Sequence, residues 1–146
     1  MNFISHINGV WKIKRKIFPN TMACGYAKIS TNKNLEIILS EKFLTTYKHS
    51  SIFGNNEYLI KIIKNKIVFF FNTGPNNGRL FQKFELSLFP KSSFFYCLKD
   101  TYQTNVFWIN KNHFRITHKI KGRNKNIFIN THYFKTNNIS LFNKFI

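Results

Sequence analysis

The chain has four arginines, Arg15, Arg79, Arg115 and Arg123, and lysine supplies the rest of its 23 basic side chains. Arginine presents a planar fork that meets a carboxylate with two parallel hydrogen bonds. Arg15 follows Gly9 and Trp11 in "GVWKIKR", and Arg115 stands seven residues after Trp108 in "WINKNHFR". An inward arginine without a carboxylate partner carries a heavy desolvation cost, whereas an outward one is ordinary surface. An inward Arg15 would therefore indicate a site for an acidic ligand.

Acidic side chains are scarce, since Glu36, Glu41, Glu57, Glu85 and Asp100 are all that the chain has. Glu36 in "NLEIIL" and Glu85 in "FELSLF" lie in apolar stretches where a strand can point a side chain into an interior. A carboxyl group held in an apolar interior has a raised pKa and can donate a proton at neutral pH. Either residue can equally face water opposite a lysine. Both are weak candidates for a catalytic acid, and the catalytic residue stays unassigned.

Cys24 and Cys97 show no CxxC spacing and no accompanying histidine pair, so the sequence predicts no metal site and no disulfide framework. We expect both to be buried free thiols. We also expect no cofactor.

The formal charge of +18 would ordinarily indicate a polyanionic partner. Lysine, asparagine, isoleucine and phenylalanine together make up about half of the residues, which is the composition that an AT-rich genome favours. Most lysines are therefore expected to be solvated surface, with no nucleic-acid partner. The opening residues lack a charged, apolar leader pattern, and no apolar run reaches the roughly 18 residues needed to span a bilayer. We expect a soluble protein without a membrane partner, made in a cytoplasm or in an organelle that encodes it.

The apolar residues occur in short runs rich in β-branched and aromatic types, separated by Asn, Gly, Ser and Lys clusters about ten residues apart. This rhythm predicts ten or so strands with short links, in an antiparallel barrel or sandwich. One helical turn is expected at residues 4–8. We predict a single domain over residues 1–146, with a core at about 8–136. The tail, residues 137–146, is expected to be a loosely docked strand or a frayed end.

Two motifs carry a resemblance to a known family. Gly9-x-Trp11 resembles the first-strand signature of the calycin, or lipocalin-like, barrels. Together with "VFWINKNHFRITHKI", Val106 to Ile120, it resembles the S-type phycobilin lyases (the CpcS/CpeS family), including the version encoded in plastid genomes. Arg15 and Phe18 match the rest of the first motif, and Trp108 and Arg115 match the second. The resemblance runs from Gly9 to Lys135, where "HYFK" lacks the acidic residue of the family's last motif.

The resemblance implies an all-β, antiparallel up-and-down calycin barrel of about eight to ten strands, closed by Gly9 and Trp11. It implies that the protein binds a phycobilin, phycocyanobilin or phycoerythrobilin, without a covalent bond and promotes its thioether attachment to a cysteine of a phycobiliprotein subunit. The bilin-binding candidates are Arg15, Phe18, Tyr102, Trp108 and Arg115. The cations would orient the propionates and the aromatic rings would flank the pigment. A plastid setting follows from the same resemblance.

Structural roles compete with these assignments. Trp11 is expected to be a core plug, and Arg115 can equally pack its guanidinium over that ring. At the level of function, the alternatives are a carrier that has lost its acid, a carrier of another hydrophobic ligand, and a non-enzymatic basic barrel that binds RNA. Assembly as a homodimer or heterodimer is left open.

Overall fold

The chain folds almost entirely into strands. The computed structural model describes residues 6–34, 36–64, 66–85, 91–97 and 99–145, and the side chains of 84–97 lie outside this description. The described elements are β1 (Gly9–Phe18), β2 (Thr21–Thr31), β3 (Ile37–Tyr47), β4 (Ser50–Ile63), β5 (Lys66–Phe71), β6 (Leu80–Glu85), β7 (Lys91–Cys97), β8 (Asp100–Asn110), β9 (His113–Gly122), β10 (Lys125–Thr136) and the short helix α2 (Leu141–Lys144). The predicted all-β class is confirmed. His6 and Ile7 are helical, and the earlier part of the expected N-terminal turn lies outside the described residues.

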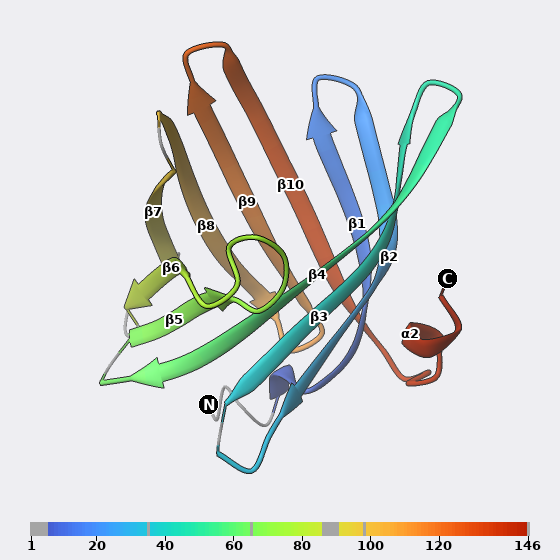
Figure 1. Ribbon diagram of the computed structural model, residues 1–146. Coiled ribbons are helices and arrows are strands. Elements are labelled where there is room, and N and C mark those ends of the chain that lie inside the picture. The colour runs from blue at the N-terminus through green and yellow to red at the C-terminus, as the bar shows by residue number, and fades with distance from the viewer. Residues whose placement is uncertain (1–5, 35, 65, 86–90, 98, 146) are drawn as a thin grey trace.

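The strands form one antiparallel sheet that curls into an up-and-down barrel. Their order is β6-β5-β4-β3-β2-β1-β10-β9-β8-β7, so every hydrogen-bonded neighbour except β1 and β10 is also a neighbour in sequence. The two edge strands, β6 and β7, lie beside each other and nearly close the barrel. Figure 1 shows the turns of the β1–β2, β3–β4 and β9–β10 hairpins at one end, with the N-terminal segment at the other.

Strand alternation separates the interior of the barrel from its basic exterior. In β1, Trp11 and Ile13 are fully buried, whereas Lys12, Lys14 and Lys16 are exposed. Successive side chains of a strand point to opposite faces, so a pattern of alternating lysine and apolar residues specifies both faces at once. Arg15 shares the phase of Trp11 and Ile13 and therefore points inward.

Trp11 closes one end of the barrel. Its ring is fully buried and packs in T-shaped pairs with Phe114 and Trp108, with ring centroids 4.8 and 6.2 Å apart. Its Nε1 donates to the carbonyl of Ile7 at 2.9 Å, which fastens the N-terminal turn to this end of the barrel. We call this end, with Trp11, Trp108 and Phe114, the floor of the barrel. Edge-to-face pairs of this kind contribute roughly 0.5–1.5 kcal/mol each beyond burial.

The cation over Trp11 is Lys135, so the alternative that Arg115 packs on this ring is wrong. Lys135 Nζ lies 5.5 Å from the centroid of the Trp11 ring and donates to the carbonyl of His6 at 2.8 Å. Gly9 has a φ of +137°, and a Cβ atom there would lie 3.1 Å from Lys135 Cε. Glycine therefore suits this position both for its backbone and for the space left to the lysine.

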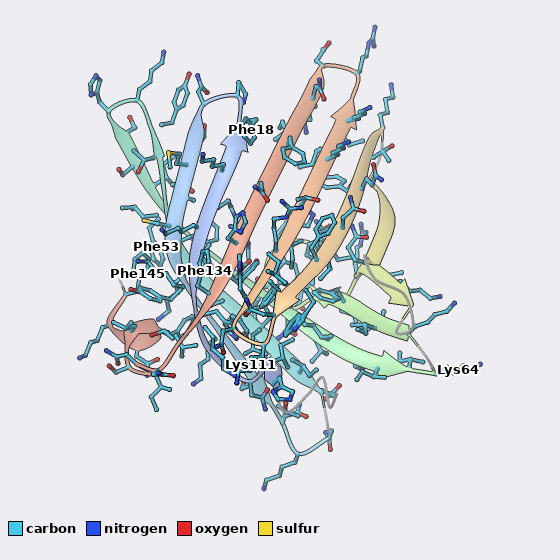
Figure 2. All side chains as sticks on the ribbon, turned by 180° about the vertical axis from the view of Figure 1, so that it is seen from behind. Phe18, Phe53, Lys64, Lys111, Phe134 and Phe145 are labelled. Atoms are coloured by element: carbon cyan, nitrogen blue, oxygen red, sulfur yellow. The ribbon has the colours of Figure 1, made fainter. Side chains whose placement is uncertain are left out.

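The C-terminal tail docks as a helix, which corrects the expected strand or frayed end. Phe142 of α2 is buried, and Lys42 Nζ lies 4.5 Å from the centroid of its ring. Phe145 meets Tyr26 and Phe53 on the outer face of β2 and β4, with centroids 5.7 and 6.4 Å apart. Figure 2 shows Phe53 and Phe145 side by side on this flank. The aromatic side chains of the tail thus cover apolar groups that β2 and β4 present to the outside.

Candidate functional site

The barrel holds a partly open cavity of about 420 Å³, within the roughly 300–1,000 Å³ usual for small-molecule sites. Its wall is built from strands on both sides of the barrel, and Asn76 of the loop between β5 and β6 contributes to it. The aromatic side chains of the wall are Phe43, Tyr58, Phe69, Phe71, Phe81, Tyr102 and Tyr133. The cavity is therefore suited to a flat, largely apolar molecule.

A buried ion pair crosses the cavity wall. Arg15 Nη2 donates to Glu41 Oε2 at 2.9 Å, and the two side chains are only 11 and 3% exposed. Arg15 Nε donates to Thr131 Oγ1 at 2.8 Å, and the guanidinium lies 4.9 Å from the centroid of the Phe43 ring. These partners come from β3 and β10, so two strands besides β1, which carries Arg15, hold the guanidinium in one orientation.

Small residues on β2 leave room for the Arg15 side chain to reach Glu41. Ala23, Gly25 and Ala27 are three of the four buried positions of β2, which lies between β1 and β3 in the sheet, and Ile29 is the fourth. Because these side chains are short, Arg15 can extend past β2 to the carboxylate of Glu41 on β3.

Electrostatics favour the charged form of Arg15 and the protonated form of the neighbouring tyrosines. Burial opposes a charge on Arg15, but the Glu41 carboxylate and nearby tyrosines outweigh it, and the pKa of the guanidinium is raised. Tyr133 Oη donates to Glu41 Oε2 at 2.7 Å. Burial first, and then the Glu41 charge, raise the pKa of Tyr133 well above its usual value, and the same causes raise the pKa of Tyr58. Glu41 thus accepts from one cation and one phenol inside an apolar cavity.

A second polar cluster lines the cavity from β6, β8 and β9. Gln82 Nε2 donates to Thr104 Oγ1 at 2.7 Å, and Thr104 Oγ1 lies 2.8 Å from His118 Nδ1. Burial, and then the positive charge of Arg15, lower the pKa of His118 to about 4. His118 is therefore neutral at pH 7 and lies within the electrostatic reach of the ion pair.

The structure brings two of the five predicted bilin-binding residues to the cavity. Arg15 and Tyr102 line it. Trp108 faces the same interior but belongs to the floor, where its ring stacks on Phe114 with centroids 5.2 Å apart. Phe18 is 45% exposed and lies against Phe128, away from the cavity, so its predicted inward position is wrong.

Arg115 also faces outward, which corrects the prediction of a second interior guanidinium. Ile116 and His118 line the cavity, and the alternation of β9 turns Arg115 to the other face. There its Cζ lies 4.4 Å from the centroid of Phe107. The site has one inward arginine among the described residues, not two.

The expected acids and thiols are placed as follows. Glu36 precedes β3 on the surface, where Lys61 Nζ lies 3.3 Å from its carboxylate. The alternative that Glu36 faces water opposite a lysine is therefore the one observed, and its candidacy as an interior acid is not supported. A hydrogen bond from Asn32, then the contact with Lys61, lower the pKa of Glu36. Cys24 is exposed, which corrects the expected buried thiol. The side chains of Glu85 and Cys97 lie outside the described residues.

The sequence interpretation missed Glu41, Tyr133 and His118. Alternation in "FRITHKI" places His118 in phase with Ile116 and Ile120, and this signal could have placed His118 in the interior. Glu41 stands in "SEKFLTTY", a segment with a weak helical appearance, and the structure shows a strand there. No local signal pairs Glu41 with Arg15, because the contact spans 26 residues.

A nearly closed up-and-down barrel around a ligand-sized cavity places the protein in the class of lipocalin-like β-barrels. The chain belongs to the DUF6314 family, a family of unknown function, whose sequence model matches residues 7–135. No curated protein matches the sequence. No described helix is long and apolar enough to cross a membrane.

Solved structures share the fold at low sequence identity. The S-type phycobiliprotein lyase CPES from Guillardia theta superposes with a TM-score of 0.66 and 10% identity, over 92% of this chain and 90% of that one. A de novo designed fluorescence-activating β-barrel gives 0.54 and 6%, over 93 and 99% of the two chains. A DUF3598 protein of unknown function from Nostoc punctiforme gives 0.55 and 8%, over 91% of this chain and 49% of that one. The chain is thus similar in fold to an S-type lyase.

Proposed function

We propose that the protein binds a phycobilin, without a covalent bond, in the barrel cavity and promotes its attachment to a cysteine of a phycobiliprotein subunit. The observation that carries the proposal is the guanidinium of Arg15, held inside an aromatic cavity of a barrel similar in fold to an S-type phycobiliprotein lyase. A plastid or cyanobacterial setting belongs to the same proposal.

The cavity offers the groups that such a ligand needs. A phycobilin is a flat open-chain tetrapyrrole with two propionates and several ring nitrogens. Arg15 meets a propionate, and the Glu41 carboxylate accepts hydrogen bonds from pyrrole N–H groups. Phe43, Phe81 and Tyr102 supply flat apolar surface. Because Arg15 and Glu41 neutralise each other, the cavity without its ligand buries no unpaired charge on this wall.

The proposed reaction is an addition that needs no oxidant. The acceptor thiolate forms a C–S bond with the exocyclic ethylidene carbon, the double bond shifts its electrons to the pyrrole ring, and a ring carbon takes up a proton. The protein's contribution is to hold one bilin conformer with its ethylidene group accessible to the thiolate. Neither Cys24 nor Cys97 is required, because the attacking sulfur belongs to the acceptor subunit.

Titration with phycocyanobilin and phycoerythrobilin tests binding. Bound pigment should show a shifted, sharpened absorbance band and should quench the fluorescence of Trp11 and Trp108, both of which lie in the floor of the barrel. Arg15→Lys keeps the charge beside Glu41 but loses the fork, and it should weaken binding about tenfold. Arg115→Lys is the matched control on the outer face and should leave the affinity unchanged.

Lyase activity needs a second assay, in which an apo-phycobiliprotein subunit is added and colour that survives denaturation is measured. Binding without attachment would identify a carrier. No spectral change with either bilin would remove the proposal. RNA binding, the rival hypothesis, is not favoured, because the structural similarity is to an S-type lyase and to a designed fluorescence-activating barrel.

A further inference from the structure

The cavity wall that β6, β8 and β9 form carries a polar cluster distinct from the ion pair. Gln82 is 1% exposed and Thr104 2% exposed, and their side chains are joined by the 2.7 Å hydrogen bond from Gln82 Nε2 to Thr104 Oγ1. Thr104 lies directly opposite His118 in the register of β8 and β9. The cluster is therefore held by three strands and is positioned before any ligand arrives.

One end of the Gln82 amide has no hydrogen-bond partner. Its Oε1 is buried, and no donor of the described chain reaches it, although Nε2 is engaged by Thr104. Leaving a buried carbonyl unpaired is unfavourable, so an atom of this kind in a cavity wall points to a ligand that supplies the donor. Gln82 lines the cavity, which gives such a ligand access to it.

His118 supplies the complementary group. Thr104 Oγ1 accepts from Gln82 and keeps its own proton, which we assign to the hydrogen bond with His118 Nδ1, 2.8 Å away. In this arrangement the neutral imidazole carries its proton on Nε2. Because burial and the nearby Arg15 keep the ring neutral at pH 7, His118 presents a single N–H donor. The ring of Phe81 lies beside it, with centroids 5.9 Å apart, and adds a flat wall.

We propose that Gln82 and His118 recognise the lactam of a terminal pyrrole ring. Gln82 Oε1 accepts the ring N–H, and His118 Nε2 donates to the adjacent ring carbonyl. A lactam presents one N–H donor and one C=O acceptor on adjacent ring atoms, and Gln82 Oε1 and His118 Nε2 are the complementary acceptor and donor. The inference rests on the proposed function, since it assumes that an open-chain tetrapyrrole occupies the cavity. The opposite wall of the cavity, with Arg15 and Glu41, would then hold the propionate end of the pigment.

A pair of two-ring probes tests the inference. A dipyrrinone carries one lactam N–H and one pyrrole N–H, whereas its N,N′-carbonyl-bridged derivative lacks both and keeps the lactam carbonyl. The protein should bind the dipyrrinone about tenfold or more tightly than the bridged compound, measured by quenching of the tryptophan fluorescence. Gln82→Met should reduce this ratio to about twofold or less by weakening the dipyrrinone alone.

Two further variants separate recognition from folding. Gln103→Met makes the same substitution on the outer face of β8, because Gln103 alternates with Tyr102 and Thr104, and it should keep the tenfold ratio. His118→Phe keeps the ring shape and should weaken both probes, since it removes the donor to their shared carbonyl. If Gln82→Met fails to fold, His118→Phe still tests the lactam inference, because unchanged binding of both probes by His118→Phe would overturn it.

The outcomes are distinct. Equal binding of the two probes by the unmodified protein, or an unchanged ratio in Gln82→Met, would overturn the lactam inference and leave bilin binding standing. Equal weakening of both probes in Gln82→Met, with a lowered melting temperature, would assign Gln82 a structural role in holding β6 to β8 through Thr104 and would also overturn the lactam inference. If neither phycobilin binds, the proposed function fails and the lactam inference fails with it.

Discussion

The buried pair Arg15–Glu41 yields the sharpest stability prediction. Replacing Glu41 with Gln keeps the shape and an acceptor for Tyr133, but it leaves the guanidinium of Arg15 buried without a counter-charge. Because the side chains are only 11 and 3% exposed and the Nη2–Oε2 distance is 2.9 Å, solvent screens little of this loss. Breaking one partner of a buried pair costs about 3–5 kcal/mol, so we expect Glu41→Gln to lower the free energy of unfolding by about 3 kcal/mol.

The double variant distinguishes an ion pair from two independent residues. Arg15→Met alone should cost about as much as Glu41→Gln, whereas Arg15→Met with Glu41→Gln should cost only about 1–2 kcal/mol, because no unpaired charge is left. Urea unfolding followed by the fluorescence of Trp11 and Trp108 measures all four proteins. Both rings lie in the floor, so their signal reports loss of the core.

An exposed pair supplies the control. Lys125 Nζ lies 3.0 Å from Asp100 Oδ2, but the two side chains are 54 and 22% exposed. Lys125→Met should therefore change stability by less than about 1 kcal/mol. Additive costs in the Arg15–Glu41 cycle, or a cost below about 1 kcal/mol for Glu41→Gln, would refute the claim that burial makes this pair strong.

Three further predictions concern the interior. In the folded protein His118 has a pKa of about 4, below its usual value, so the unfolded chain takes up a proton at higher pH than the folded one. The free energy of unfolding should therefore fall by about 3 kcal/mol as the pH drops from about 6.5 to 4. Urea titrations across this range should show a smaller fall for His118→Gln. Trp11→Ala should cost about 3–5 kcal/mol by opening the floor, and a melting temperature within a few degrees of the unmodified protein would contradict the role of that ring. A Cβ at Gly54 would lie 2.6 Å from Phe43 Cε2, so Gly54→Ala should lower the free energy of unfolding by about 1–3 kcal/mol. Adding Phe43→Leu should recover part of this loss. No recovery would show that the strain does not come from Phe43.

Strand parity explains why one arginine was placed correctly and the other was not. Trp11 and Arg15 share β1, where an even spacing puts both side chains on the same face. Trp108 and Arg115 lie on different strands, with a turn between them and a register shift between Trp108 and Asn110. Phe114 pairs with Trp108, so Arg115 faces the outside. Parity cannot be counted across a turn and an irregular register, because each adds an unknown phase.

The sequence by itself determined the fold class, the basic exterior and the strand phase that Arg15 shares with Trp11 and Ile13. These follow from the two-residue period of a strand, which the alternation of lysine with apolar residues in β1 displays openly. Tertiary structure alone decided that Arg15 meets Glu41, that Lys135 covers Trp11, and that Gln82, Thr104 and His118 meet. Each of these contacts joins residues far apart in the chain, and the order and curvature of ten strands bring them together. Local patterns specify which face a side chain takes, whereas the curled sheet determines which inward side chains become neighbours.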